Sequence, residues 1–399
     1  MDYPKSVPGS GLVDGKFVDE DAIAGTPGSL IPASWGNSVT QEILGAITAA
    51  GLKPDEAQTD QLAQAIRQLS KPDPLQQFPA QVYRRNVLIN GGFDIWQRGT
   101  TNPGPSIGGY VADRFRCDWN GNAGVAISQQ SFAPGQSEVA DEPRFFLRWQ
   151  QTLAGTAATV HKVSQAVESV RTLAGKTATV TFWARSDAVR PLSVSVAQNF
   201  GTAGSESVEK IVDVFQLGTS WKKYSATFRL PGIAGKMLGT NNFLRLAFDL
   251  PLNVLQTVDL AQIQLEEGPV STPFEYRPMA EELMLCQRYF EKSFATWLPV
   301  RANNGPATCI STFTQAAPAN SGQTAMTVGM LVQKRVLPTV VMYCPGNTSN
   351  QVWNQTVGAC TGSTVQGSTE RAISFATFTP VGSSPGQTLQ IEWTADAEL

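Results

Sequence analysis

The hydrophobic period of this chain changes from helical to strictly alternating after a proline-rich segment, and this change constrains the fold more than any other feature. Residues 70–79 hold three prolines in ten positions, which is typical of an extended linker. Beyond them apolar and polar residues alternate, as at Val180, Phe182 and Ala184, and again in two later segments. Successive strands with no amphipathic helix between them predict an antiparallel β-sandwich over residues 86–278.

One predicted strand contains a break in this alternation. Within residues 257–265 the apolar positions shift from Val258 and Leu260 to Ile263 and Leu265. One extra residue in one strand of an antiparallel pair produces such a shift. We therefore expect a β-bulge inside this strand.

Residues 1–70 follow a different pattern. The first thirty residues are rich in Gly, Pro and Asp without a sustained period, so we expect extended chain or chain ordered by a partner. Two short helices are predicted next, over residues 32–50 with Gly51 as the cap, and from about Thr59. Such helices bury little surface alone, so they need each other, another copy of the chain or a host surface. Residues 71–85 are predicted to be the linker.

The segment after the sandwich, residues 279–292, is predicted to be a helix. Its apolar residues lie on more than one side, so the helix must be buried on more than one side. It either connects two β domains of one chain or packs near a symmetry axis against copies of itself. The residues of this possible contact are Met279, Leu283, Cys286 and Phe290. Residues 293–399 again show strands and polar loops, so the fold class is mainly β, with a C-terminal β-sandwich.

Charge and hydropathy exclude two classes of protein. With 30 basic and 33 acidic residues the net charge is −3, which leaves no electrostatic footprint for nucleic acid. No apolar run approaches the ~20 residues of a membrane helix, and the first residues do not read as a signal peptide. We expect neither nucleic-acid binding nor membrane insertion.

Side-chain chemistry argues against catalysis. The chain has one histidine, His161, so a three-histidine zinc site is impossible and any histidine-dependent acyl transfer must use that ring. Five cysteines are scattered without a Cys-x-x-Cys pair, which is typical of buried, reduced thiols in a cytoplasmic product. Neighbouring carboxylates such as Glu266 and Glu267 diverge in a strand instead of facing one sugar bond. We expect no enzymatic activity and no cofactor.

A family resemblance is carried by several segments that occur in the family's order. These are IPASWGNSVTQEILGAITAAGLKPDEAQTDQLAQAIRQL, NVLINGGFDIWQRGT, GGYVADRFRCDW, KTATVTFWARS, TSWKKYSATFRLP, TVDLAQIQLEEGPVSTPFEYRP and AEELMLCQRYFEKS. Over roughly residues 31–294 the chain resembles tail fibre proteins of bacteriophages and prophages. The middle part is similar to jelly-roll carbohydrate-binding modules, and residues 295–399 match in type alone.

The resemblance implies a homotrimeric, non-enzymatic receptor-binding protein of the virion. Its N-terminus would dock on tail or baseplate proteins, and its C-terminal tip would bind a host surface glycan, such as lipopolysaccharide, or a pilus. Two alternatives are a tailspike that depolymerises polysaccharide and a structural collar or connector protein. Relatives often hold calcium, and Asp94 and Asp259 are candidate remnants of such a site. Two carboxylates are fewer than the six to eight oxygens that calcium takes, so the metal stays open.

The receptor site is predicted in a loop over residues 345–359, which follows a strand at residues 338–344. This loop is polar and rich in turn formers, and it offers an indole platform with amide donors and acceptors. The candidate residues are Trp353, Asn347, Asn350, Asn354 and Gln355. The alternative is that Trp353 tucks into the sandwich. Cys344 and Cys360 flank the loop and could bridge outside the cell, although reduced thiols are the default.

The middle module is predicted to be mainly a spacer. Phe182 lies on the core side of its strand, so Trp183 lies on the opposite side. Trp183 and Trp119 are the secondary candidates for stacking against a glycan. The alternative for Trp183 is packing against the second sheet or a neighbouring subunit.

Overall fold

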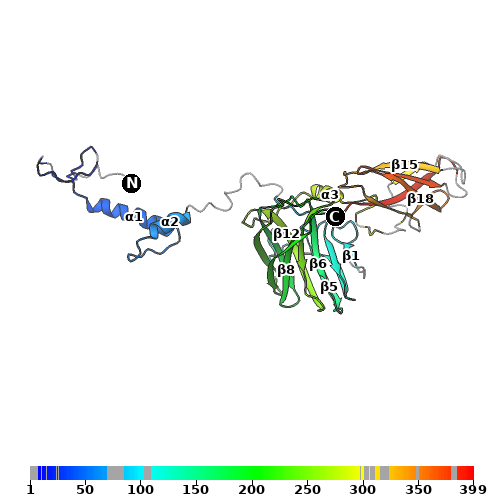
Figure 1. Cartoon of the computed structure of the whole chain (residues 1–399), viewed down its shortest axis with the longest axis horizontal. Coiled ribbons are helices and arrows are strands. Elements are labelled where there is room, and N and C mark those ends of the chain that lie inside the picture. The colour runs from blue at the N-terminus through cyan, green and yellow to red at the C-terminus, as the bar shows by residue number, and fades with distance from the viewer. Residues whose placement is uncertain are drawn as a thin grey trace. The chain divides into compact units, whose positions relative to one another are not determined.

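The computed structural model divides the chain into two compact units, Met1–Ala80 and Gln81–Leu399. It describes residues 8–9, 11–14, 16–23, 25, 27–69, 85–102, 109–296, 298–300, 305, 311–314, 323–346, 350–378 and 384–399. Most of the predicted linker, residues 71–84, lies outside these ranges. Figure 1 shows the helical unit in blue and the β unit from cyan to red.

The N-terminal unit contains the two predicted helices, α1 (Ala33–Ala49) and α2 (Gln61–Leu69). α1 begins directly after Pro32, and Gly51 follows its end with a φ of +75°, a conformation that glycine adopts without strain. Ile47 and Ala65 are buried between the two helices, whereas Ile66 of α2 is 56% exposed. The helix predictions are confirmed, and much of the apolar surface of α2 stays exposed within this unit.

The middle of the chain is a jelly roll. In the described residues, two six-stranded antiparallel sheets have the orders β1-β4-β5-β12-β7-β10 and β2-β3-β6-β11-β8-β9. From β5 to β12 the chain changes sheet at every connection except β8 to β9, which is the strand order of a jelly roll. The strands are β1 (Thr101–Asn102), β2 (Gly109–Tyr110), β3 (Arg116–Trp119), β4 (Gly124–Ser131), β5 (Phe145–Leu153), β6 (His161–Glu168), β7 (Thr177–Ser186), β8 (Arg190–Asn199), β9 (Val208–Leu217), β10 (Lys222–Arg229), β11 (Phe243–Asp249) and β12 (Gln256–Glu267).

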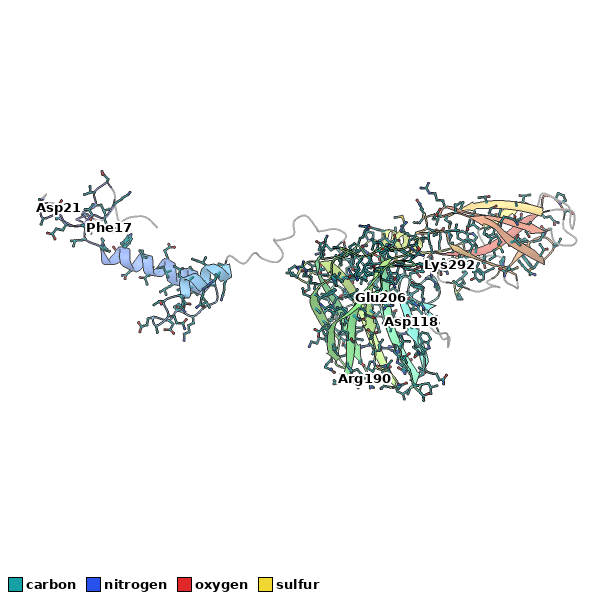
Figure 2. All side chains as sticks on the ribbon, in the orientation of Figure 1. Phe17, Asp21, Asp118, Arg190, Glu206 and Lys292 are labelled. Carbon is teal, nitrogen blue, oxygen red and sulfur yellow. The ribbon has the colours of Figure 1, made fainter. Side chains whose placement is uncertain are left out.

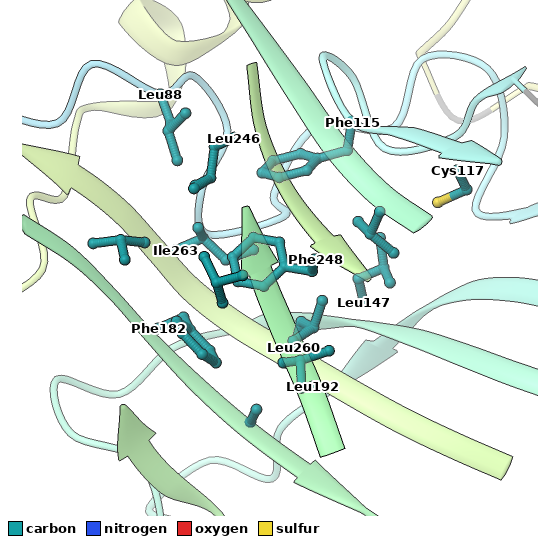
Figure 3. Packing of buried hydrophobic residues seen from close by; sticks show 14 of the residues in the cluster. Leu88, Phe115, Cys117, Leu147, Phe182, Leu192, Leu246, Phe248, Leu260 and Ile263 are labelled. Atoms are coloured by element: carbon teal, nitrogen blue, oxygen red, sulfur yellow. The ribbon is translucent and has the colours of Figure 1, made fainter. Parts of the chain in front are cut away.

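The core of the jelly roll lies between the two sheets, where the alternating pattern places the apolar side chains. Phe182 is fully buried, and Figure 3 shows it in the core with Phe248. Its ring lies 5.0 Å from that of Phe248 and 5.5 Å from that of Tyr224. The expected bulge is confirmed, because the pairing of β12 with β7 shifts register between Ala261 and Gln264. The sequence therefore predicted correctly which side chains of these strands face the core.

The C-terminal part is organised around the last strand, β20 (Thr388–Asp396). Among the described strands the sheet has the order β13-β20-β17-β18-β19-β15, and β14 and β16 also pair with β20. The other elements are α3 (Met279–Gln287), β13 (Phe290–Lys292), β14 (Ser311–Thr314), β15 (Gln323–Gly329), β16 (Thr339–Tyr343), β17 (Gln351–Asn354), β18 (Ala359–Ser368) and β19 (Ala372–Phe378).

The predicted helix over residues 279–292 is too long, and its end is corrected here. α3 ends at Gln287, and Phe290 lies in β13, which pairs with β20 opposite Asp396. Pairing with a strand a hundred residues away overrides the local helical period at this end. Cys286 and Phe290 are buried within the chain itself, whereas Met279 is 41% exposed. The connecting role of this segment within one chain is confirmed, and two of the four suggested trimer contacts are already covered.

Charged side chains join the jelly roll to the C-terminal strands. Arg98 lies 3.0 Å from Asp396, and its guanidinium stacks 3.7 Å from the centre of the Phe290 ring. Arg114, which is buried, forms an ion pair with Glu398. Figure 2 shows Lys292 at this junction. None of the helices that the structure describes is long and apolar enough to cross a membrane.

Candidate functional site

The outer side of one jelly-roll sheet brings together an aromatic ring and several cations. Strand pairing aligns Asp259 of β12 with Arg148 of β5 on one side and Arg185 of β7 on the other. In the next row, Trp183 of β7 lies opposite Ala261 of β12 and Lys223 of β10. We call this surface the Trp183 face, and it also includes Ser128 and Gln130 of β4, which pair with Arg148 and Phe146.

A buried carboxylate orients the two arginines of this face. Asp259 is 3% exposed and accepts hydrogen bonds from Nε and Nη2 of Arg148, both at 2.8 Å, and from Nε of Arg185 at 2.9 Å. The hydrogen bond to Asp259 raises the pKa of Arg148. Arg185 uses Nε alone for Asp259, so its two Nη groups stay outside this ion pair. The side chains of Arg148 and Arg185 are 30% and 29% exposed. Asp259 thus holds both guanidinium groups in place while part of each side chain faces solvent.

Trp183 packs against a small aromatic cluster. Phe132, Phe146 and Trp221 lie with ring centroids 4.8–5.2 Å apart, and half-buried Trp183 packs against this cluster. The Arg185 guanidinium stacks 4.9 Å from the centre of the Trp221 ring. An indole with one part packed and another part exposed is a rigid apolar platform. Together with guanidinium, ammonium and amide donors, it can bind the ring face and the hydroxyl or carboxylate rim of a sugar.

The carboxylates suggested as remnants of a calcium site do not fit a calcium ion. Asp259 is neutralised by Arg148 and Arg185, and Asp94 pairs with Arg144 at 3.0 Å. Guanidinium groups already supply the positive charge that a cation would bring. Within the ranges described above, no group of three or more His, Cys, Asp or Glu side chains is placed to hold a metal ion.

Trp119 is removed from the candidate glycan surface. It is 2% exposed, and its ring packs edge-on against Trp149 at 5.9 Å inside the jelly-roll core. β3 has four residues, too few for alternation to show which side faces the core. Trp183, by contrast, lies on the outer side of its sheet as predicted from parity.

The predicted receptor loop contains a strand, β17, which pairs with β18 and β20. Asn354 is fully buried, and its Oδ1 accepts a hydrogen bond from the Thr356 N–H, so it is removed from the receptor set. Asn350 and Gln355 are exposed at opposite ends of β17, about 16 Å apart by strand geometry. Asn347 lies outside the described residues.

Trp353 itself is half-buried in β17. Its indole covers Gly346, where a Cβ would collide with the ring, and approaches Gly358. Among the described candidates of this loop, the two exposed amides, Asn350 and Gln355, therefore lie beyond opposite ends of the strand that holds the indole.

The one histidine is not available for chemistry at the surface. His161 is 1% exposed, its Nδ1 lies 3.0 Å from the carbonyl oxygen of Pro251, and its ring packs 5.9 Å from Trp149. Burial of this ring keeps substrates away from the residue on which histidine-dependent catalysis would depend.

The Arg148–Asp259–Arg185 row was missed from the sequence, although a signal was present. Residues 146–148 and 183–185 both have an aromatic residue, an apolar residue and an arginine in that order. On strands this spacing places the ring and the guanidinium on one side of the sheet. What the sequence could not show is that β12 inserts its aspartate between the two arginines.

No protein-family model matches the sequence, and no curated protein matches it. A solved structure of the enzymatically active domain of bacteriophage CBA120 tailspike protein 4 is similar at a TM-score of 0.31 and 12% identity, over 46% of this chain and 21% of that chain. The CBM22-2 xylan-binding domain of Paenibacillus barcinonensis Xyn10C has a TM-score of 0.27 and 18% identity, over 39% of this chain and 92% of its own.

A third similar structure is TmCBM61 in complex with β-1,4-galactotriose, with a TM-score of 0.27 and 14% identity, over 46% of this chain and 99% of its own. The sandwich fold is established by the strand order given above, and the class of protein it defines is a β-sandwich chain with a jelly-roll module.

Proposed function

We propose that this chain is a bacteriophage tail fibre protein that attaches the virion to a host cell by binding a surface glycan through its jelly roll. The Trp183 face carries this proposal, because it combines an aromatic platform with arginines fixed by Asp259. This gives the jelly roll a binding role in place of the spacer role predicted from the sequence. Trp353 of the C-terminal strands stays as the competing receptor site.

The binding test compares the two tryptophans in the full-length protein. Calorimetric titration with host surface polysaccharides, both neutral and acidic, should show that Trp183→Ala weakens binding about tenfold or more, if stacking contributes ~1–3 kcal/mol. Trp353→Ala is the matched control and should leave the affinity unchanged. Loss of binding in Trp353→Ala alone would assign the receptor site to the C-terminal strands instead.

We propose further that the protein binds its glycan without cleaving it. Buried Glu266 accepts hydrogen bonds from Thr272 and Gln264, and Glu282 pairs with Arg277, so these carboxylates have structural partners. Incubation with host polysaccharide should leave its chain length unchanged by size-exclusion chromatography. A fall in chain length would favour the tailspike depolymerase.

The remaining parts of the proposal concern assembly. The N-terminal unit is proposed to dock on tail or baseplate proteins, so a fragment beginning at Gln81 should bind polysaccharide as the full chain does. The resemblance to tail fibres implies a homotrimer, and light scattering should then give a mass near three chains. Met284 of α3 is 53% exposed in the single chain, so Met284→Asp should dissociate a trimer formed through α3 without unfolding the chain.

A further inference from the structure

Two cysteines of the C-terminal strands lie in direct contact. Cys344 follows the end of β16, Cys360 is the second residue of β18, and their Sγ atoms are 3.0 Å apart. The sulfurs of a disulfide are about 2.05 Å apart, so a shift of about 1 Å would bring these two to bonding distance. Such a shift is within the reach of side-chain rotation.

We propose that Cys344 and Cys360 form an intrachain disulfide once the protein leaves a reducing environment. The thiols are reduced in the structure, as expected for a chain made in a cytoplasm. A protein that acts at the outside of a cell meets oxidising conditions, where such a pair is converted. This inference depends on the contact of the two sulfurs and not on which face binds a glycan.

The surroundings of the two thiols determine which of them reacts first. Cys360 is half-buried, whereas Cys344 is fully buried, so a small oxidant reaches Cys360 first. Burial, and then the hydrogen bond with Cys344, raise the pKa of Cys360 to about 12. Little thiolate is present at neutral pH, so the reaction is slow there and accelerates as the pH rises.

The chemistry is thiol–disulfide exchange with a small disulfide such as oxidised glutathione. The Cys360 thiolate attacks that disulfide, which forms a mixed disulfide and releases one glutathione thiolate. Cys344 then loses its proton and attacks Sγ of Cys360, which releases the second glutathione. Two protein thiols are oxidised to one disulfide, and the glutathione disulfide is reduced to two thiols.

The bond would constrain the hairpin region that contains Trp353. It would join the end of β16 to the start of β18 and close a loop between residues 16 positions apart, with β17 inside it. Closing a loop of this size lowers the conformational entropy of the unfolded chain. We expect the melting temperature of the oxidised protein to be roughly 5 °C above that of the reduced protein.

The experiment treats the full-length protein with oxidised glutathione at pH 8.5 and counts thiols after denaturation. Five thiols before treatment should become three, with a mass loss of two hydrogen atoms and a cross-linked peptide that joins Cys344 to Cys360. Cys360→Ser and Cys344→Ala should each abolish this change, and reductant should reverse it. Cys117→Ser and Cys309→Ser are matched controls, and both should still form the bond.

Three results would overturn the inference. They are five thiols remaining after treatment, a stable glutathione adduct on Cys360 without loss of the Cys344 thiol, or cross-linked dimers on a non-reducing gel. An oxidised protein that melts at or below the temperature of the reduced protein would contradict the stabilising role. Each of these outcomes is independent of glycan binding by the Trp183 face.

Discussion

The jelly roll and the C-terminal strands differ in how the two sides of a strand are buried. In the jelly roll, two sheets enclose an apolar core, and the outer side of a strand such as β7 reaches the surface with Trp183 and Arg185. In the C-terminal part, β20 is covered on both sides. Leu389, Ile391 and Trp393 face one way, and the alternating residues Gln390, Glu392 and Thr394 are buried as well.

This difference shows which interactions each region depends on. The jelly roll depends mainly on apolar packing between its two sheets, although it also buries Asp259 between Arg148 and Arg185. The C-terminal strands bury charges, such as Lys334 with Glu291, whose ammonium and carboxylate are 2.6 Å apart and fully or nearly fully buried. They also attach to the jelly roll through arginines and carboxylates. Loss of one member of this pair should therefore destabilise the C-terminal strands.

The largest expected effect is in the jelly-roll core. Phe182→Ala removes a ring that contacts Tyr224 and Phe248 and should cost about 3–5 kcal/mol in the free energy of unfolding. Denaturant titration measures this loss. Phe375→Ala, in the smaller C-terminal core, should cost less, and Ile211→Ala at a 64% exposed position should change stability by under ~0.5 kcal/mol. Equal losses for Phe182 and Phe375 would contradict the contrast between the two cores.

The second prediction tests the buried ion pair of the C-terminal strands. Lys334→Met leaves the Glu291 carboxylate buried without its cation and should cost about 3 kcal/mol, with earlier proteolysis of the C-terminal strands. Adding Glu291→Leu to this variant should restore much of the loss, because no buried charge remains. If the double variant is as unstable as the single one, the pair contributes packing instead of charge compensation.

The smallest expected effect concerns the junction. Asp113 is 1% exposed, and burial raises its pKa from the ordinary value of 3.8 to about 6, against the opposing effects of Arg98 and Gln97. The folded protein keeps a proton between about pH 4 and 6 that the unfolded chain has released. The contribution of Asp113 to stability is therefore most favourable below about pH 4 and declines as the pH rises to about 6.

Unfolding measured from pH 4 to pH 7 checks this sign. The difference in stability between the wild type and Asp113→Asn should change over this range by on the order of 2–3 kcal/mol. Asp213→Asn, at an exposed aspartate of β9, is the control. A difference that does not depend on pH would mean that Asp113 ionises as it does in the unfolded chain.

The candidate site was predictable in part. Parity placed Phe182 in the core and Trp183 outside, because side chains alternate across a sheet whatever its neighbours are. Two other candidates were placed wrongly without the help of this rule: Trp119, which is buried in the core, and Asn354, which was predicted to lie in a loop but is buried in β17. The pairing of Asp259 with Arg148 and Arg185 depends on which strands become neighbours, and the sequence pattern does not contain that information.

The sequence by itself determined the helices after Pro32, the alternation of the jelly-roll strands and the bulge in β12, because each is encoded within a few neighbouring residues. The tertiary structure decided the end of α3, the contact of Cys344 with Cys360 and the composition of the Trp183 face. Each of these depends on strand pairing or packing between residues far apart in the chain. Such contacts form when all strands of a sheet pair together. The pairing of the strands therefore decides which distant residues meet, and the hydrophobic pattern of a short segment does not.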